Sequence, residues 1–181
     1  VPASLLMAIC QANLRHFAKT MEKPSLVLSR LNEVLHEEMQ LGLFVTVIYA
    51  VIDFKAHQLT LARAGHELPL FISKGELPRF LASPGMGVGM VGKDIFDLAI
   101  DDVEVPFELD DVLMLYTDGV TESVDGKGNE YTKERLAELV MTGSSLMSTL
   151  QLNESVLESV QAFSGKQAHL DDFTLVTIKH R

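Results

Sequence analysis

Residues 43–64 read LFVTVIYAVIDFKAHQLTLARA and contain two consecutive strand patterns. Residues 43–53 form an apolar run rich in β-branched side chains, and residues 57–64 alternate between apolar and polar side chains. The link between them is far too short for a parallel crossover, which needs about a dozen residues or more. The stretch therefore predicts an antiparallel hairpin, and with it a fold whose sheets are antiparallel.

The flanking sequence predicts helices on both sides of a strand-rich middle. Helical spacing and start signals predict helices at 2–19, 25–39, 132–141 and 146–163. Further strands are predicted at 67–73, 77–81, 95–105, 111–117 and 173–179. The glycine-rich stretch 83–92 is expected to be an exposed loop. Together these elements predict an α+β fold, with helices packed on sheet faces and all of residues 1–181 in a single domain.

The composition excludes several classes of protein. Among 181 residues, 15 are Lys or Arg and 25 are Asp or Glu, giving a net charge of −10. Such a chain lacks the basic surface that nucleic acid or an anionic membrane requires. The only cysteine, Cys10, excludes an internal disulfide and fits a reducing, cytoplasmic setting. The opening residues show neither a signal peptide nor an initiator Met, so we expect the chain to be part of a longer protein.

Aspartates at two strand ends are the candidate functional residues. Asp118 ends the predicted strand 111–117, and Asp171 and Asp172 directly precede the strand 173–179. If these strands are antiparallel neighbours, Asp118 and Asp171 meet at one rim of the sheet, where a cation would relieve their repulsion. Such hard oxygen ligands suit magnesium or manganese. From spacing alone, however, an ordinary Asp-Gly turn and a solvated strand start remain the favoured alternative.

A resemblance to a known family changes that balance. The stretch LYTDGVTE at 115–122 resembles the signature of the metal-dependent PPM-type (protein phosphatase 2C-like) serine/threonine phosphatases, in their bacterial SpoIIE-like branch. Weaker matches follow in the family's order: VPASLLMA at 1–8, FVT at 44–46 with Tyr49 and Ile52-Asp53, AGH at 64–66 with Pro69, and DDFT at 171–174. The resemblance covers nearly the whole chain.

The resemblance implies a fold, a reaction and a site. The fold is an antiparallel β-sandwich flanked by helices in α-β-β-α layers. The reaction is hydrolysis of phosphoserine or phosphothreonine on a protein, by a water that two manganese or magnesium ions activate. Asp118 and Asp171 then are metal ligands and catalytic residues, and Asp172 ranks second beside Asp171. His66 receives no chemical role and is expected to be a hydrogen-bonded structural residue.

The chain also departs from the family pattern. The family's Gly-Asp-x-Tyr-Asp and Asp-Val-x-Gly-His-Gly segments, which supply the aspartate that bridges both metals, do not occur here. We therefore expect an N-terminally truncated domain that is inactive by itself, whatever the parent protein does.

The parent protein is expected to act in bacterial signalling. The resemblance implies a phosphorylated anti-sigma-factor antagonist as substrate and an upstream sensor or receiver domain, and it is compatible with a homodimer. Two alternatives remain open: a degenerate phosphatase fold that acts as a non-catalytic binding switch, and an unrelated α+β binding module in which the Asp-Gly turn is incidental.

Overall fold

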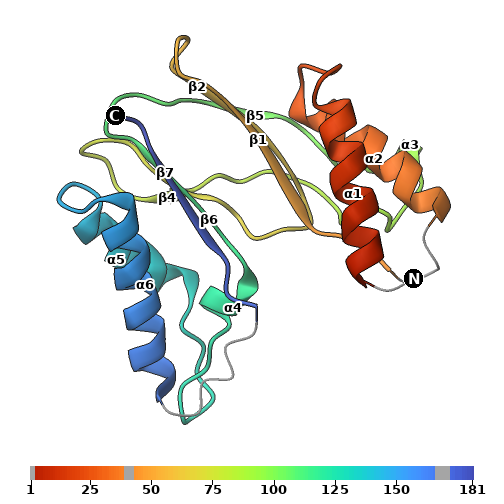
Figure 1. Cartoon of the computed structure of the whole chain (residues 1–181). Helices are drawn as coiled ribbons and strands as arrows, with labels where there is room; N and C mark the ends of the chain where they lie inside the picture. Colours follow the sequence, from red (N-terminus) through yellow and green to blue (C-terminus); the bar gives the residue numbers. More distant parts are fainter. Residues whose placement is uncertain (1–2, 39–42, 166–171) are drawn as a thin grey trace. The chain divides into compact units, whose positions relative to one another are not determined.

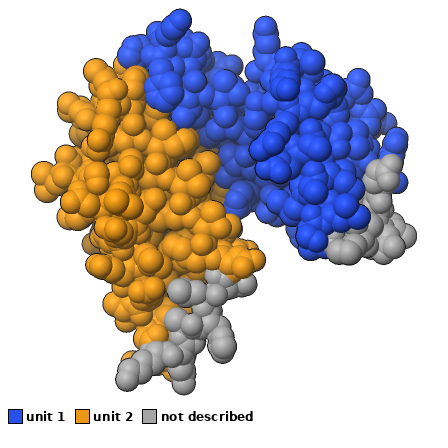
Figure 2. Space-filling model, viewed as in Figure 1, with its two compact units in different colours: residues 1–66, 82–106 blue, residues 67–81, 107–181 orange. Residues whose placement is uncertain are grey.

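The computed structural model describes residues 3–38, 43–165 and 172–181 (Figure 1). The chain divides into two compact units, one of residues 1–66 and 82–106 and the other of residues 67–81 and 107–181 (Figure 2). In the described part of the chain, no helix is both long enough and apolar enough to cross a membrane.

The first unit is built on a three-stranded antiparallel sheet in the order β1-β2-β5. Its strands are β1 (Val47–Asp53), β2 (Gln58–Ala64) and β5 (Val103–Pro106). The register runs from Val47 opposite Ala64 to Asp53 opposite Gln58, so the predicted hairpin is confirmed. At its turn, Asp53 Oδ1 accepts the backbone N–H groups of Lys55 at 2.8 Å and Ala56 at 2.9 Å.

Three helices belong to this unit: α1 (Ala3–Phe17), α2 (Pro24–Glu38) and α3 (Lys93–Leu98). Helix α2 packs against β2 with the fully buried side chains of Leu28, Leu31 and Leu35. These residues recur at helical spacing, so one buried stripe of α2 joins the core of this unit.

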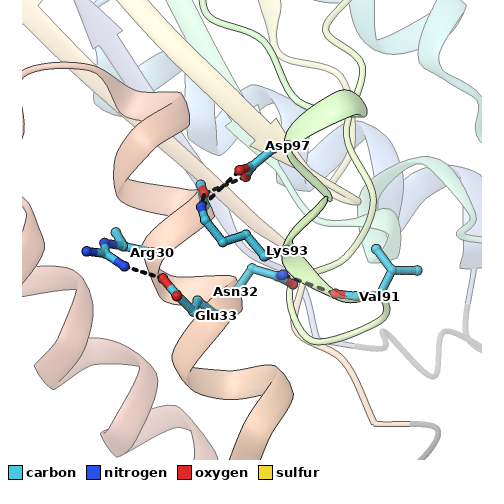
Figure 3. Close-up of polar contacts among 7 residues, drawn as sticks. Arg30, Asn32, Glu33, Val91, Lys93 and Asp97 are labelled. Carbon is cyan, nitrogen blue, oxygen red and sulfur yellow. Dashed lines mark hydrogen bonds and ion pairs between the residues drawn. The ribbon is translucent and has the colours of Figure 1, made fainter. Parts of the chain in front are cut away.

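A polar stripe of α2 binds the segment that leads into α3 (Figure 3). The amide of Asn32, which is fully buried, donates to Val91 O at 3.0 Å and accepts from Gly89 N at 2.8 Å. Lys93 Nζ lies 2.9 Å from Asp97 in α3. The buried amide thus satisfies a backbone donor and a backbone acceptor that would otherwise be costly to bury.

Two predictions fail in this segment. Residues 95–105 were expected to form one strand, but the structure has α3 followed by the short strand β5. The stretch 83–92 is irregular, as predicted, but it is not an exposed loop, because Val88 is fully buried. Val88 and Val45 exchange both backbone hydrogen bonds, at 2.9 and 2.8 Å, as an isolated β-bridge.

The second unit holds a four-stranded antiparallel sheet in the order β4-β3-β6-β7. Its strands are β3 (Leu70–Ile72), β4 (Arg79–Phe80), β6 (Val112–Tyr116) and β7 (Leu175–Lys179). The helices are α4 (Asp118–Thr121), α5 (Lys133–Gly143) and α6 (Thr149–Ser164). A capping box between Ser148 and Gln151 opens α6.

The core of this unit lies between the sheet and helices α5 and α6. Its buried apolar members come from both layers: Leu70, Ile72, Val112, Met114, Val120, Leu136, Val140, Leu152, Val156 and Val160. Each unit therefore joins an antiparallel sheet to helices, which confirms the predicted α+β class. The assignment of residues 1–181 to a single domain stays a prediction.

Candidate active site

The candidate site begins where β6 ends. Tyr116 is the last residue of the strand, Thr117 follows it, and Asp118 opens the short helix α4. The side chain of Asp118 is exposed, and its Oδ1 accepts the N–H of Gly119 at 2.9 Å. The carboxylate of Asp118 thus lies at the rim of the sheet, where the chain leaves β6 and enters α4. The simple Asp-Gly turn weighed as an alternative is in fact a one-turn helix.

The neighbouring strand β7 begins at the same rim. Leu175, its first residue, pairs with Tyr116 in an antiparallel register, so the predicted pairing of these two strands is confirmed. Asp172 lies just before β7 and is exposed. Asp171, the other predicted ligand, lies outside the described residues. The proximity of its carboxylate to that of Asp118 therefore stays a prediction.

Thr117 joins the two segments. Its backbone N–H donates to Thr174 O at 3.1 Å, and its hydroxyl Oγ1 donates to Asp172 O at 2.7 Å. The same hydroxyl accepts the N–H of Thr174 at 2.9 Å. Sequence reasoning gave Thr117 no role of its own, although it directly precedes Asp118 in the motif.

The chemistry of these side chains fits a hard divalent cation. Carboxylate oxygens are the ligands that magnesium and manganese prefer, and an exposed carboxylate at a strand end is accessible to a hydrated ion. Within residues 3–38, 43–165 and 172–181, no three His, Cys, Asp or Glu side chains cluster as a metal site would require. The described carboxylates at the rim are Asp118 and Asp172. A metal ion bound there would need additional ligands besides these two side chains.

The other aspartate pairs have structural roles. Asp102 accepts both the N–H and the hydroxyl of Ser25, at 2.7 and 2.9 Å, in the first turn of α2. Asp111 is buried and accepts the N–H groups of Lys74 at 3.0 Å and Glu108 at 2.9 Å.

His66 lies in the first unit, directly after the bridge residue Gly65. Its side chain is half-buried, and its carbonyl oxygen accepts a hydrogen bond from Arg63 Nη1 at 2.7 Å. Arg63 also donates to Ser83 O from Nε at 2.9 Å. This hydrogen bond is to the backbone of His66, so the structural role expected of its side chain stays a prediction.

Tyr116 adds an unusual feature beneath the rim. Its side chain is 2% exposed, and its hydroxyl has no hydrogen-bond partner among the described residues. Burial, together with the charges of Glu67 and Glu134, raises the pKa of Tyr116 above its usual range. The phenol is therefore neutral at any physiological pH, and it packs as part of the core.

Comparison with known proteins gives a family match along the whole chain. The family model for Stage II sporulation protein E (SpoIIE) matches residues 1–181. The phosphoserine phosphatase RsbU of Bacillus subtilis is 29% identical over 184 residues, which cover 100% of this chain and 52% of that protein. The chain therefore spans about half the length of this relative.

Solved structures show the same fold. The SiaA-PP2C domain of Pseudomonas aeruginosa superposes with a TM-score of 0.84 at 19% identity, over 100% of this chain and 70% of that one. RsbX in complex with magnesium superposes with a TM-score of 0.65 at 14% identity, over 94% of this chain and 70% of that one. With the fold, the rim motif and the match along its full length, the chain belongs to the SpoIIE family of PP2C-like phosphatase domains.

Proposed function

We propose that the protein containing this chain is a metal-dependent phosphatase that hydrolyses phosphoserine or phosphothreonine on a protein. One observation carries the proposal: β6 presents the exposed Asp118 at the rim where β7 begins, and Thr117 binds the Asp172 segment to that same point. The family membership and the phosphoserine phosphatase RsbU as a relative support the reaction class.

Asp118 and Asp171 are the proposed metal ligands, with Asp172 second in rank. When bound, two manganese or magnesium ions would supply an activated water and neutralise phosphate charge. The solved relative RsbX in complex with magnesium supports the choice of metal. The chain's own part is to hold these carboxylates at fixed positions, because an ion that must also reorganise its ligands binds weakly.

The substrate is proposed to be a small phosphorylated anti-sigma-factor antagonist, and the setting a bacterial signalling pathway in the cytoplasm. A sensor or receiver domain elsewhere in the parent chain would control the activity. The net charge of −10 argues against nucleic acid as a partner. We further propose that the 181 residues alone are inactive, since they contain neither segment in which the family carries its metal-bridging aspartate.

The test compares two aspartates at opposite ends of β6 in the full-length protein. With a phosphoserine protein substrate and excess manganese, Asp118→Asn should lower kcat/KM at least about 100-fold, because a catalytic metal contributes several kcal/mol. Asp110→Asn, the matched control, should leave it unchanged, since Asp110 pairs with Lys74 at the other end of the strand.

Each result decides the proposal. Normal turnover in Asp118→Asn would remove Asp118 from the site and overturn the assignment. A wild-type protein that neither hydrolyses the substrate nor binds manganese would support the non-catalytic binding switch instead. Manganese-dependent hydrolysis that Asp118→Asn abolishes and Asp110→Asn preserves would support the phosphatase.

A further inference from the structure

Thr117 occupies the point at which β6 and β7 separate. In a regular antiparallel ladder, every second pair of opposed residues exchanges both N–H···O=C hydrogen bonds. Following the register from Tyr116 opposite Leu175, the next opposed residues are Thr117 and Thr174. Only half of the exchange is present: Thr117 N donates to Thr174 O at 3.1 Å.

The hydroxyl of Thr117 replaces the other half. The N–H of Thr174 donates to Thr117 Oγ1 at 2.9 Å instead of to the carbonyl of Thr117. That carbonyl accepts the N–H of Val120 at 3.0 Å, a bond that forms the first turn of α4. The side chain therefore lets the backbone leave the sheet for α4 while β7 remains attached.

The same hydroxyl also reaches the chain before β7. Oγ1 donates its proton to Asp172 O at 2.7 Å, so one oxygen atom contacts both sides of Phe173. As a result Asp118, which follows Thr117, and the Asp172–Phe173 peptide are held to one common atom. We infer that Thr117 is the positioning residue that sets the separation of the two carboxylate-bearing segments, and thereby the affinity of the rim for manganese.

This inference rests on the proposed function but makes a separate claim. Residues that orient metal ligands without touching the ion typically change metal affinity by about 10- to 100-fold when lost. The affected groups here are exposed or half-buried, so water can satisfy them after the hydroxyl is removed. Loss of the hydroxyl should therefore affect the geometry of the rim much more than the stability of the fold.

The experiment measures manganese binding directly, by isothermal titration calorimetry on the full-length protein. Thr117→Val keeps the β-branched shape and removes the hydroxyl, and it should weaken manganese binding about tenfold or more. Thr117→Ser restores the hydroxyl and should bind manganese nearly as the wild type does. At saturating manganese, kcat in Thr117→Val should recover toward the wild-type value.

Thr177→Val is the matched control. Thr177 lies in the same strand β7, and its hydroxyl donates to Asn153 Oδ1 of α6 rather than to the rim. The same substitution there should leave manganese affinity unchanged. Equal loss of affinity in both variants would show a general weakening of β7 and would overturn the inference.

The remaining outcomes separate this inference from the proposed function. Asp118→Asn that binds manganese like the wild type would remove the metal site itself. Loss of binding in Asp118→Asn, with wild-type affinity in Thr117→Val, would overturn only the role of Thr117. Should Thr117→Val not fold, Thr117→Ala carries the same expectation, and failure of both to fold would show a purely structural residue and overturn the inference.

Discussion

The two ends of strand β6 carry the same residue type and use it differently. At the start, Asp111 is 2% exposed and its two oxygens accept the N–H groups of Lys74 and Glu108. At the end, Asp118 is exposed, and its side-chain hydrogen bond is a local one, from Gly119 N to Oδ1. Both oxygens of the Asp111 carboxylate are occupied by hydrogen bonds within the fold, whereas the carboxylate of Asp118 is accessible to solvent. Hydrogen bonding therefore distinguishes a structural aspartate from a candidate ligand.

The sharpest way to break this contrast is to remove the second proposed ligand. In the full-length protein, Asp171→Asn should lower phosphatase kcat/KM at least about 100-fold, because an amide keeps the shape but loses the charge that holds a divalent cation. Asp172→Asn should have a smaller effect, because Asp172 ranks second. Both are measured with a phosphoserine substrate over a manganese titration.

The relative size of the two effects carries the information. A larger loss in Asp172→Asn than in Asp171→Asn would reverse the ranking and make Asp172 the ligand. The unfolding midpoint of Asp172→Asn should match the wild type, since the exposed carboxylate of Asp172 contributes little to stability.

At the other end of the strand the expected loss is of stability, not of activity. Asp111→Asn replaces one of two buried acceptor oxygens by an NH₂ group, which then faces a backbone N–H. An unsatisfied buried donor costs about 1–3 kcal/mol, so the free energy of unfolding should fall by roughly that amount. Urea denaturation measures the change. Unchanged stability with a loss of turnover would contradict the division of roles between the two ends.

Local patterns predicted the β1-β2 hairpin and helices α1, α2, α5 and α6, because each depends on neighbours in sequence. They failed for α3, where Phe96, Leu98 and Ile100 alternate like a strand. In the structure Phe96 and Ile100 are buried while Leu98 is 90% exposed. Phe96 enters the core from α3 and Ile100 enters it from the segment after that helix, so only tertiary packing decides between the two periods.

The glycine content of residues 83–92 also led to a wrong prediction, that of an exposed loop. At Gly85 the backbone has φ of 155°, and a Cβ would lie 1.7 Å from Arg63 O. This glycine permits a close approach of two backbones, shown by the hydrogen bond from Gly65 N to Gly85 O at 3.2 Å. Composition alone cannot tell such an approach from an exposed loop.

For the site, strand order was predictable and hydrogen bonding was not. Residue pattern placed Asp118 at the end of one strand and Asp172 before another, and the antiparallel pairing of those strands is confirmed. The role of Thr117 depends on its carbonyl, which accepts a hydrogen bond within α4 instead of one from β7. No local sequence pattern encodes that choice. The metal roles of Asp118, Asp171 and Asp172 stay predictions.

A smaller effect, on stability, is expected at Tyr116, the last residue of β6. Tyr116→Phe removes a buried hydroxyl that lacks a partner among the described residues, so it should raise the free energy of unfolding by up to about 1 kcal/mol. Tyr131→Phe is the control, because the Tyr131 hydroxyl lies 2.7 Å from Ser159 Oγ and its loss should destabilise. Destabilisation by Tyr116→Phe would show that its hydroxyl is satisfied after all.

The smallest effect on stability is expected at Asp110, just before the start of β6. Asp110 Oδ2 lies 2.8 Å from Lys74 Nζ, and both side chains are largely exposed, so solvent screens the pair. The hydrogen bond and charge of Lys74 lower the pKa of Asp110 below its usual value, and the pKa of Lys74 is raised in return. Asp110 has φ of 73°, a conformation that Asn tolerates, so Asp110→Asn removes the charge with little backbone strain.

The sign of the pH dependence follows from these directions. A carboxyl whose pKa is lowered on folding stabilises the protein above its unfolded pKa of about 3.9, and the contribution disappears as pH falls through the folded value. Lys74, whose pKa is raised, contributes below about 10.4 and loses its contribution as pH rises through its folded pKa. The thermal midpoint of Asp110→Asn should therefore lie slightly below that of the wild type at pH 7, and the two should converge in strong acid. A difference that grows on acidification would show that the Asp110–Lys74 pair does not carry the effect.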